Sequence, residues 1–399
     1  MARTHSLLPS LPIGSSSDAE NTPFHPPFCP NPCCLYHHAP PPEDELWWRD
    51  HGRYRTKIAG RIRRLRCRRC GRTFSERTFS TAYYIKVQIN LVAALLCLVG
   101  GMSLRAIARG LGCSMGSLSN RFARMGRQAA AMHAELAATV SLAEDLCADG
   151  FVDFTVSQYF PDVTTVLVGS RSQMIYSLDH GFLRRRGRMT ARQRRRRARL
   201  ERLFRAARSA EKNTFACALA ETLERNWNPA RPLILDTDKN PLYPRALAAL
   251  AKEIPAIGDP KRFHHRVTSG EAPRTHANHL FPVNYIDRQI RLNLAAHRRQ
   301  TVCFARNTAA TLDRTVLLMC YHNYNKAHRI VDTRPTPSAH AVVAGVDEQA
   351  IIGWWRRFFL SRTFFTHTSL SGFLRSVWLR TNETPLSKAP DYLPKYAFA

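Results

Sequence analysis

Apolar and polar residues alternate with different periods in different parts of the 399-residue chain. Past residue 144, β-branched and aromatic residues gather in short runs bounded by turn residues, which is typical of strands. These runs predict three strands at 146–156, 163–168 and 173–178, and a fourth at 233–235. Helices are expected at 189–225, 245–253 and about 283–299. Three strands, a helix, a strand and further helices predict an α/β fold with a mixed sheet flanked by helices.

A helical period precedes this domain. Residues 103–112 predict an amphipathic helix that starts at a serine and ends at a glycine, and residues 117–125 predict a second helix after a short turn. Together they resemble a helix-turn-helix, which implies that the second helix faces a DNA groove. The residues expected to face the groove are Ser117, Asn120, Arg121 and Arg124. An ordinary helical hairpin is the alternative.

Residues 29–80 hold five of the eleven cysteines and an alternating basic run, 54–66, that predicts a strand. The run leads into Cys67-Arg68-Arg69-Cys70-Gly71, and a Cys-x-x-Cys-Gly turn places two thiolates on one tight loop. The segment resembles a zinc ribbon, although the distance in sequence from Cys34 to Cys67 is longer than usual. The predicted ligands of a structural Zn2+ are Cys29, Cys34, Cys67 and Cys70, with Cys33, His37 or His38 as substitutes. Free thiols are the alternative, and the other six cysteines are expected in the core.

Charge changes the picture, because 59 Lys and Arg against 30 Asp and Glu give a net charge of +29. Such an excess favours nucleic acid or another anionic partner. Thirteen arginines lie between residues 184 and 208, where Glu201 is the only acid. A solvated face is the ordinary interpretation of such a block, and contact with the DNA backbone is the functional one. The residues assigned to that contact are Arg184, Arg185, Arg186, Arg188, Arg194, Arg195, Arg196 and Arg197.

No secretory signal is recognised in the first eighteen residues, and the longest apolar stretch, 91–100, is about half of what a bilayer span needs. A cytoplasmic, nucleoid-associated protein without a membrane partner is therefore expected. Eleven cysteines in a reducing compartment favour metal binding and core packing over disulfides.

Three aspartates occupy separate predicted elements. Asp149 lies in the first strand, Asp238 just after the fourth, and Asp287 in the last helix. Carboxylates that are distant in sequence and meet at one point are how proteins hold two Mg2+ or Mn2+ ions for phosphoryl transfer. Asp153 lies on the same strand face but about 13 Å from Asp149, too far for both to serve one metal pair. Asp153 is therefore the alternative first acid. Arg291, one turn beyond Asp287, is a candidate phosphate contact.

The sequence around these acids resembles that of DDE insertion-sequence transposases. Asp238 is preceded by Thr237 and followed at Tyr243 by a tyrosine, as in a conserved segment of that family. The helix segment of the family resembles Asn284-Tyr285-Ile286-Asp287-Arg288 followed by Arg291, Arg298, Arg299, Thr301 and Phe304, and its closing segment resembles His322-Asn323-Tyr324-Asn325. The resemblance covers about residues 29–330. Asp287 stands where the family most often has the longer glutamate.

The resemblance implies an RNase H-like catalytic domain with Asp149, Asp238 and Asp287 as catalytic and metal-binding residues. It implies a DNA transposase that binds the terminal repeats of its element and target DNA, and that acts as a homo-oligomer. A non-catalytic DNA-binding regulator or relic is the alternative, and a nuclease with the same fold is a nearer variant. The expected segments are a lead-in at 1–28, the ribbon at 29–80, the helix-turn-helix at 81–140, the catalytic domain at 141–330 with an arginine-rich insertion at about 184–225, and an aromatic and basic extension at 331–399.

Overall fold

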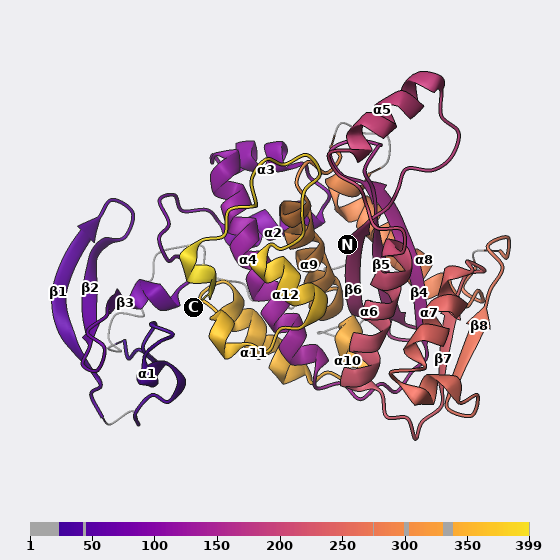
Figure 1. The fold of residues 1–399 in the computed structure, drawn as a ribbon. Coiled ribbons are helices and arrows are strands. Elements are labelled where there is room, and N and C mark those ends of the chain that lie inside the picture. Colours follow the sequence, from indigo (N-terminus) through magenta and orange to yellow (C-terminus); the bar gives the residue numbers. More distant parts are fainter. Residues whose placement is uncertain (1–23, 43–44, 274, 299–302, 330–337, 399) are drawn as a thin grey trace, which may run out of the picture.

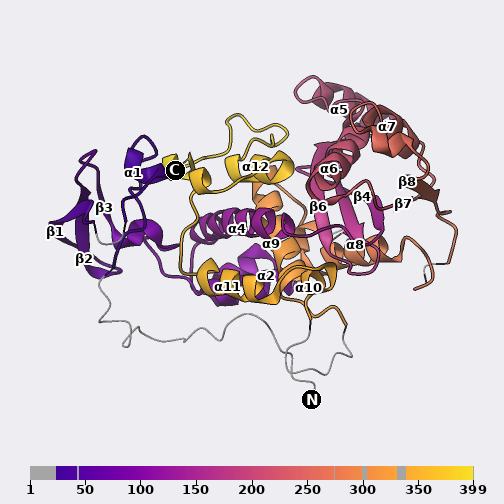
Figure 2. The ribbon, with the colours of Figure 1, turned by 90° about the horizontal axis from the view of Figure 1, so that it is seen from below.

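The computed structural model describes residues 24–42, 45–273, 275–298, 303–329 and 338–398. The molecule is elongated (Figures 1 and 2), with a small sheet at one end, a group of helices in the middle and a larger sheet at the other end. Helices and strands both contribute to the larger end, so the predicted α/β character is confirmed.

The small sheet carries the first cysteines. It contains β1 (Trp48–Thr56), β2 (Gly60–Cys67) and β3 (Thr73–Ser75), all antiparallel, next to the short helix α1 (Leu35–His38). The prediction of one strand over 54–66 is wrong, because the chain turns back between β1 and β2. Gly60 ends this turn with φ of +60°, a conformation that glycine adopts without steric cost.

The middle of the molecule is built around one long helix. Helices α2 (Leu91–Val99) and α3 (Leu104–Gly110) precede α4 (Met115–Ala137), and Ser103 and Ser114 cap α3 and α4 by accepting backbone N–H bonds. The sequence places the end of α4 near residue 125, but the helix runs for 23 residues. It continues because its later residues are apolar and pack against α9 (Thr308–Tyr324).

The C-terminal chain completes this helical middle. It forms α10 (His340–Ala344), α11 (Glu348–Phe358) and α12 (Gly372–Leu379). Trp355 of α11 is buried, and its indole N–H donates to the backbone oxygen of Tyr324 at 3.0 Å. The same chain contacts the segment that follows the small sheet, where the backbone N–H of Arg362 donates to the Phe79 carbonyl at 2.7 Å. The aromatic extension is therefore largely core.

The larger sheet has the strand order β6-β5-β4-β7-β8. Its strands are β4 (Leu146–Phe154), β5 (Pro161–Gly169), β6 (Ile175–Phe182), β7 (Leu233–Thr237) and β8 (Phe263–Val267). Strands β4, β5 and β6 pair antiparallel, whereas β7 pairs parallel with both β4 and β8. The predicted mixed sheet is confirmed, and β8 is an additional edge strand.

Helices cover both faces of this sheet. Helix α6 (Ala210–Asn226) packs on β5 and β6, and α8 (Phe281–Asn293) packs on β4 and β5 from the other face (Figure 2). Helix α7 (Leu242–Leu250) packs against α6. The predicted helix at 189–225 is two helices, because α5 (Ala191–Glu201) ends well before α6 begins. The short 3-10 helices are Glu76–Phe79, Pro255–Gly258, Ala295–His297, Phe365–His367 and Lys395–Phe398.

Candidate functional site

Four cysteines meet at the end of the small sheet. The sulfur atoms of Cys29, Cys34, Cys67 and Cys70 all lie within 4.8 Å of one another. The Sγ–Sγ distance is 3.6 Å for Cys29 and Cys70 and 3.9 Å for Cys34 and Cys67. A tetrahedral zinc ion with Zn–S bonds of about 2.3 Å separates its sulfurs by about 3.8 Å. The predicted grouping is confirmed, and the four thiols can bind a metal ion such as zinc.

The neighbouring candidates lie outside this cluster. Cys33 is exposed, and the His38 ring nitrogen Nε2 contacts the Pro32 carbonyl. His37 is buried, with its Nδ1 2.6 Å from the Cys29 carbonyl and its Nε2 2.5 Å from the Thr366 hydroxyl. His37 therefore orients the loop of Cys29 and ties it to the C-terminal chain.

The thiols of Cys29 and Cys70 differ in their affinity for protons. Burial raises the pKa of Cys29 above its ordinary value. Burial also acts to raise the pKa of Cys70, but hydrogen bonds, first from the Arg72 backbone and then from Asn31, lower it to about 7. Thiolate is the form that binds metal, and the Cys70 thiol is more readily ionised than that of Cys29.

Asp149 and Asp238 come together through the pairing of two neighbouring strands. Strands β4 and β7 run parallel, with Leu146 opposite Leu235 and Cys147 opposite Asp236. Asp149 and Asp238 each lie two residues beyond the last recorded pair, and they are near enough for the charge of Asp238 to raise the pKa of Asp149. Parallel pairing thus delivers two acids that are distant in sequence to one edge of the sheet.

Tyr243 of α7 marks the centre of this acidic region. Its hydroxyl donates to Asp149 Oδ1 at 3.5 Å. Burial raises the pKa of Tyr243, and the negative charges of Asp149, Asp238, Glu211 and Asp287 raise it further. Carboxyl groups from β4, α6, α8 and the loop after β7 therefore act on one hydroxyl group.

The same surroundings affect Asp149 itself. Burial raises the pKa of Asp149 to about 6, and the nearby charges of Asp238 and Glu211 act in the same direction. The backbone N–H of Gly150, which donates to Asp149 Oδ1 at 2.7 Å, acts against the shift. A buried carboxyl among other carboxyls has a higher affinity for a cation, because the cation removes their repulsion.

The three predicted acids all affect Tyr243 by their charge, but their oxygen atoms do not lie close enough together to be identified as the ligands of one metal ion. Within the part of the chain that the structure describes, the cysteine cluster is the only group of three or more His, Cys, Asp or Glu ligands within 4.8 Å. Asp287, on α8, reaches the acidic region through its charge on Tyr243. The motif residues Arg299 and Thr301 lie outside the described residues.

Glu211 is an acid that sequence reasoning missed. It lies in the first turn of α6, and Asn240 Nδ2 is 3.4 Å from its Oε1. A Cβ atom built on Gly150 would be 3.9 Å from the same oxygen. Burial raises the pKa of Glu211, Arg186 lowers it and Asp238 raises it. The available signal was an acid directly after the arginine block, at a helix start.

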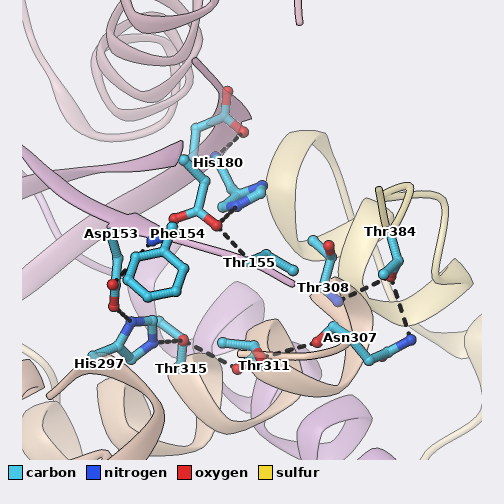
Figure 3. Close-up of polar contacts among 12 residues, drawn as sticks. Asp153, Phe154, Thr155, His180, His297, Asn307, Thr308, Thr311, Thr315 and Thr384 are labelled. Carbon is cyan, nitrogen blue, oxygen red and sulfur yellow. Dashed lines mark hydrogen bonds and ion pairs between the residues drawn. The ribbon is translucent and has the colours of Figure 1, made fainter. Parts of the chain in front are cut away.

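Asp153 has a structural role in this fold. Its Oδ2 lies 3.1 Å from His297 Nδ1, and both side chains are buried. Figure 3 shows the chain of contacts that continues from His297 to Thr315, 3.4 Å away, and on through Thr311 to Asn307. Asp153 therefore belongs to a polar network that joins β4 to α9.

The predicted groove-facing residues have different surroundings. Arg121 is buried, and its guanidinium donates to the Val87 carbonyl at 3.0 Å. Burial lowers the pKa of Arg121 to about 10. Asn120 is exposed and Ser117 is half-buried, while Arg124 donates to the backbone oxygens of Thr81 and Tyr83. Arg121 is thus an internal residue that fixes the segment before α2, and the prediction that it faces a groove is not met.

Most of the predicted backbone-binding arginines are exposed. Helix α5 has no buried residue and projects from the body of the molecule (Figure 1). Within it Arg197 pairs with Glu201 at 3.2 Å, and in the preceding loop Arg184 donates to the Ala206 carbonyl. Arg291 is placed differently, with its guanidinium 4.2 Å from the centre of the Phe151 ring.

Comparison of the chain with models of known protein families gave no match, and comparison with curated protein sequences gave none either. In the described residues, no helix is both long enough and apolar enough to cross a membrane.

Proposed function

We propose that the protein is a DNA-processing enzyme of the DDE transposase type, with an RNase H-like catalytic domain at 141–330. The observation that carries the proposal is that Asp149 of β4 and Asp238, directly after the paired strand β7, are near enough for the charge of Asp238 to raise the pKa of Asp149. The Tyr243 hydroxyl also contacts Asp149. An acid on the first strand and another directly after the fourth is the arrangement of that fold. Asp287 on α8 supplies the third acid of the sequence motif.

The chemistry of the carboxylates fits Mg2+ or Mn2+, since hard cations prefer oxygen ligands. Asp149, Asp238 and Asp287 would hold such ions, and bound ions supply charge stabilisation and an activated oxygen nucleophile for phosphodiester transfer. The Tyr243 hydroxyl orients the Asp149 carboxylate. Neutral Asp149, favoured below its pKa of about 6, is the form that does not bind a cation.

Binding of double-stranded DNA in this proposal begins at α5. Its arginines form an exposed basic helix at the same end of the molecule as the acids. Arg186, in the loop before α5, lowers the pKa of Glu211 by its charge, so the basic loop lies close to the acidic region. Phosphate contacts position a duplex without reading its sequence, so element ends would be recognised elsewhere, by the Zn2+ ribbon and the α3 and α4 segment.

The test is divalent-metal-dependent cleavage and strand joining on DNA that carries the ends of the element. We compare the intact protein with Asp149→Asn, Asp238→Asn and Asp287→Asn, and use Glu253→Gln, an exposed carboxylate after α7, as the control. Loss of cleavage in the three variants with DNA binding retained supports the proposal. Full cleavage by Asp238→Asn would contradict it.

A non-catalytic DNA-binding protein is the second candidate. The observation that favours it is that, among the described residues, the cysteines lie close enough together to bind one metal ion and the aspartates do not. DNA binding without cleavage in any divalent metal, by a protein of confirmed zinc content, would establish this second candidate.

A further inference from the structure

A large cleft lies between the small sheet, the start of α4 and the C-terminal chain, remote from the acidic region. Its volume is about 1180 Å3. Pro30 and Pro32 of the cysteine loop, Asn120 of α4 and Pro394 near the C-terminus all line it. Small-molecule sites occupy about 300–1,000 Å3, so this cleft has room for a larger ligand.

The lining of the cleft is basic. Its charged members are Arg64, Arg72, Arg124, Arg362 and Lys395, and none of its described lining residues is Asp or Glu. None of the ion pairs identified among the described residues involves these five cations. Among the described residues, the cleft lining therefore has a positive charge and no ion pair with a carboxylate, and it suits an anionic ligand.

The lining is also aromatic, and its rings reach solvent. Three aromatic side chains are exposed in the described part of the chain, namely Tyr84 at 77%, Tyr392 at 74% and Phe398 at 53%. All three line this cleft. Exposed aromatic residues are costly in water, and their concentration in one cleft indicates a ligand with flat apolar faces.

The backbone at Tyr84 supports this interpretation. Its φ is +51°, in the left-handed region that residues with a side chain rarely adopt. The ring lies 4.2 Å from that of Tyr83, centre to centre, and is held outward. Local strain at an exposed side chain is typical of a binding site.

We infer that this cleft binds single-stranded DNA, with bases stacked on Tyr84, Tyr392 and Phe398 and phosphates beside the exposed Arg64, Arg72 and Lys395. Bases within a duplex hide their faces in the stack, whereas an unpaired strand offers them to aromatic rings. Arginine contributes in the same way, since Arg64 already lies 5.2 Å from the centre of the Tyr54 ring. The site is independent of the carboxylates.

The test is fluorescence anisotropy with a labelled oligo(dT) strand and a labelled duplex, without added divalent metal. Tyr84→Ala and Tyr392→Ala are each expected to raise the Kd for oligo(dT) about tenfold and to leave duplex binding unchanged. Leu96→Ala on α2, which shortens a side chain that is 42% exposed and outside both the cleft and the arginine block, is the matched control and is expected to change neither. Circular dichroism confirms that the variants are folded.

A second pair of variants tests the charge. Lys395 lines the cleft, and Lys388, also exposed, does not. Lys395→Gln is expected to reduce the slope of log K against log salt for oligo(dT) by about 0.7, and Lys388→Gln to leave it unchanged. Equal losses on strand and duplex in the tyrosine variants, or unchanged oligo(dT) affinity, would overturn the inference. The readout is binding alone, so failure of the catalytic proposal would not affect it.

Discussion

The Asp149 carboxyl links folding, pH and proposed chemistry in a single residue. Its pKa is raised to about 6 by burial, whereas the ordinary value is 3.8. The native state therefore binds more protons than the unfolded state between these values, and its stability falls as pH rises from about 4 to 6. Above pH 6 the folded protein bears the full cost of a buried carboxylate.

Asp149→Asn is expected to stabilise the protein by about 1–3 kcal/mol at pH 7.5 and by little at pH 4. Urea unfolding at the two pH values measures this. Added Mg2+ is expected to raise the melting temperature of the intact protein and not that of the variant, because the amide does not replace a carboxylate ligand. A destabilised variant at pH 7.5 would show that Asp149 is a structural acid.

Asp153 lies on the same strand, but its replacement is expected to destabilise the protein. Removal of Asp153 leaves the buried His297 Nδ1 without this hydrogen-bond partner, so Asp153→Ala is expected to cost about 1–3 kcal/mol. The control is Asp50→Ala, whose pair with Arg63 is surface-exposed and contributes little to stability. The midpoint of urea unfolding distinguishes them. Similar midpoints for the two variants would contradict the role assigned to the network of His297.

At the scale of elements, local sequence patterns predicted most strands of the larger sheet. They predicted the bounds of the helices less accurately. Strands β4, β5 and β7 have apolar runs, so the sequence located them and the acids attached to them. Strand β8 was missed because Phe263 and Val267 flank three polar or basic residues, as an edge strand permits. The length of α4 was missed because a glycine, Gly126, interrupts its apolar pattern.

That glycine has a packing reason that no local pattern contains. A Cβ atom on Gly126 would lie 3.0 Å from the Asp313 carboxylate and 3.1 Å from its Cα on α9. Close approach of α4 and α9 thus depends on residues almost 190 positions apart. Glu211 was missed for a similar reason, since only the fold brings α6 beside Gly150.

Substitutions in helix α5 are expected to weaken DNA binding without changing the stability of the fold. Because none of its residues is buried, Arg194→Gln with Arg195→Gln is expected to change the free energy of unfolding by less than about 0.5 kcal/mol. The same pair is expected to lower the salt slope of duplex binding by about 1.8. Arg245→Gln with Arg356→Gln, two exposed arginines on other helices, is the charge-matched control. An equal change of slope in both double variants would show that α5 is only a solvated face.

At the scale of the whole molecule, the small sheet is held by its cysteines and by the C-terminal chain. Its own core is a small cluster that includes Trp47, Leu65 and Phe74. Small cores of this kind are usually stabilised by a metal or by disulfides. The link through His37 and Thr366 joins the sheet to the body but does not replace a metal at the loop of Cys29.

We therefore expect one zinc ion for each chain, and Cys34→Ser to lose it. Cys33→Ser is the matched control, since its thiol is adjacent in sequence but exposed and outside the cluster. Hydrogen exchange of Cys34→Ser should show faster exchange in β1 and β2 and unchanged protection in α4 and α9, because the body has a separate core. The loop of Pro30 and Pro32 also forms a wall of the basic cleft, so the same variant should lose affinity for oligo(dT). If Cys34→Ser retained zinc and Cys33→Ser lost it, the ligand would be Cys33 and not Cys34. That result would contradict the geometry of the four sulfurs.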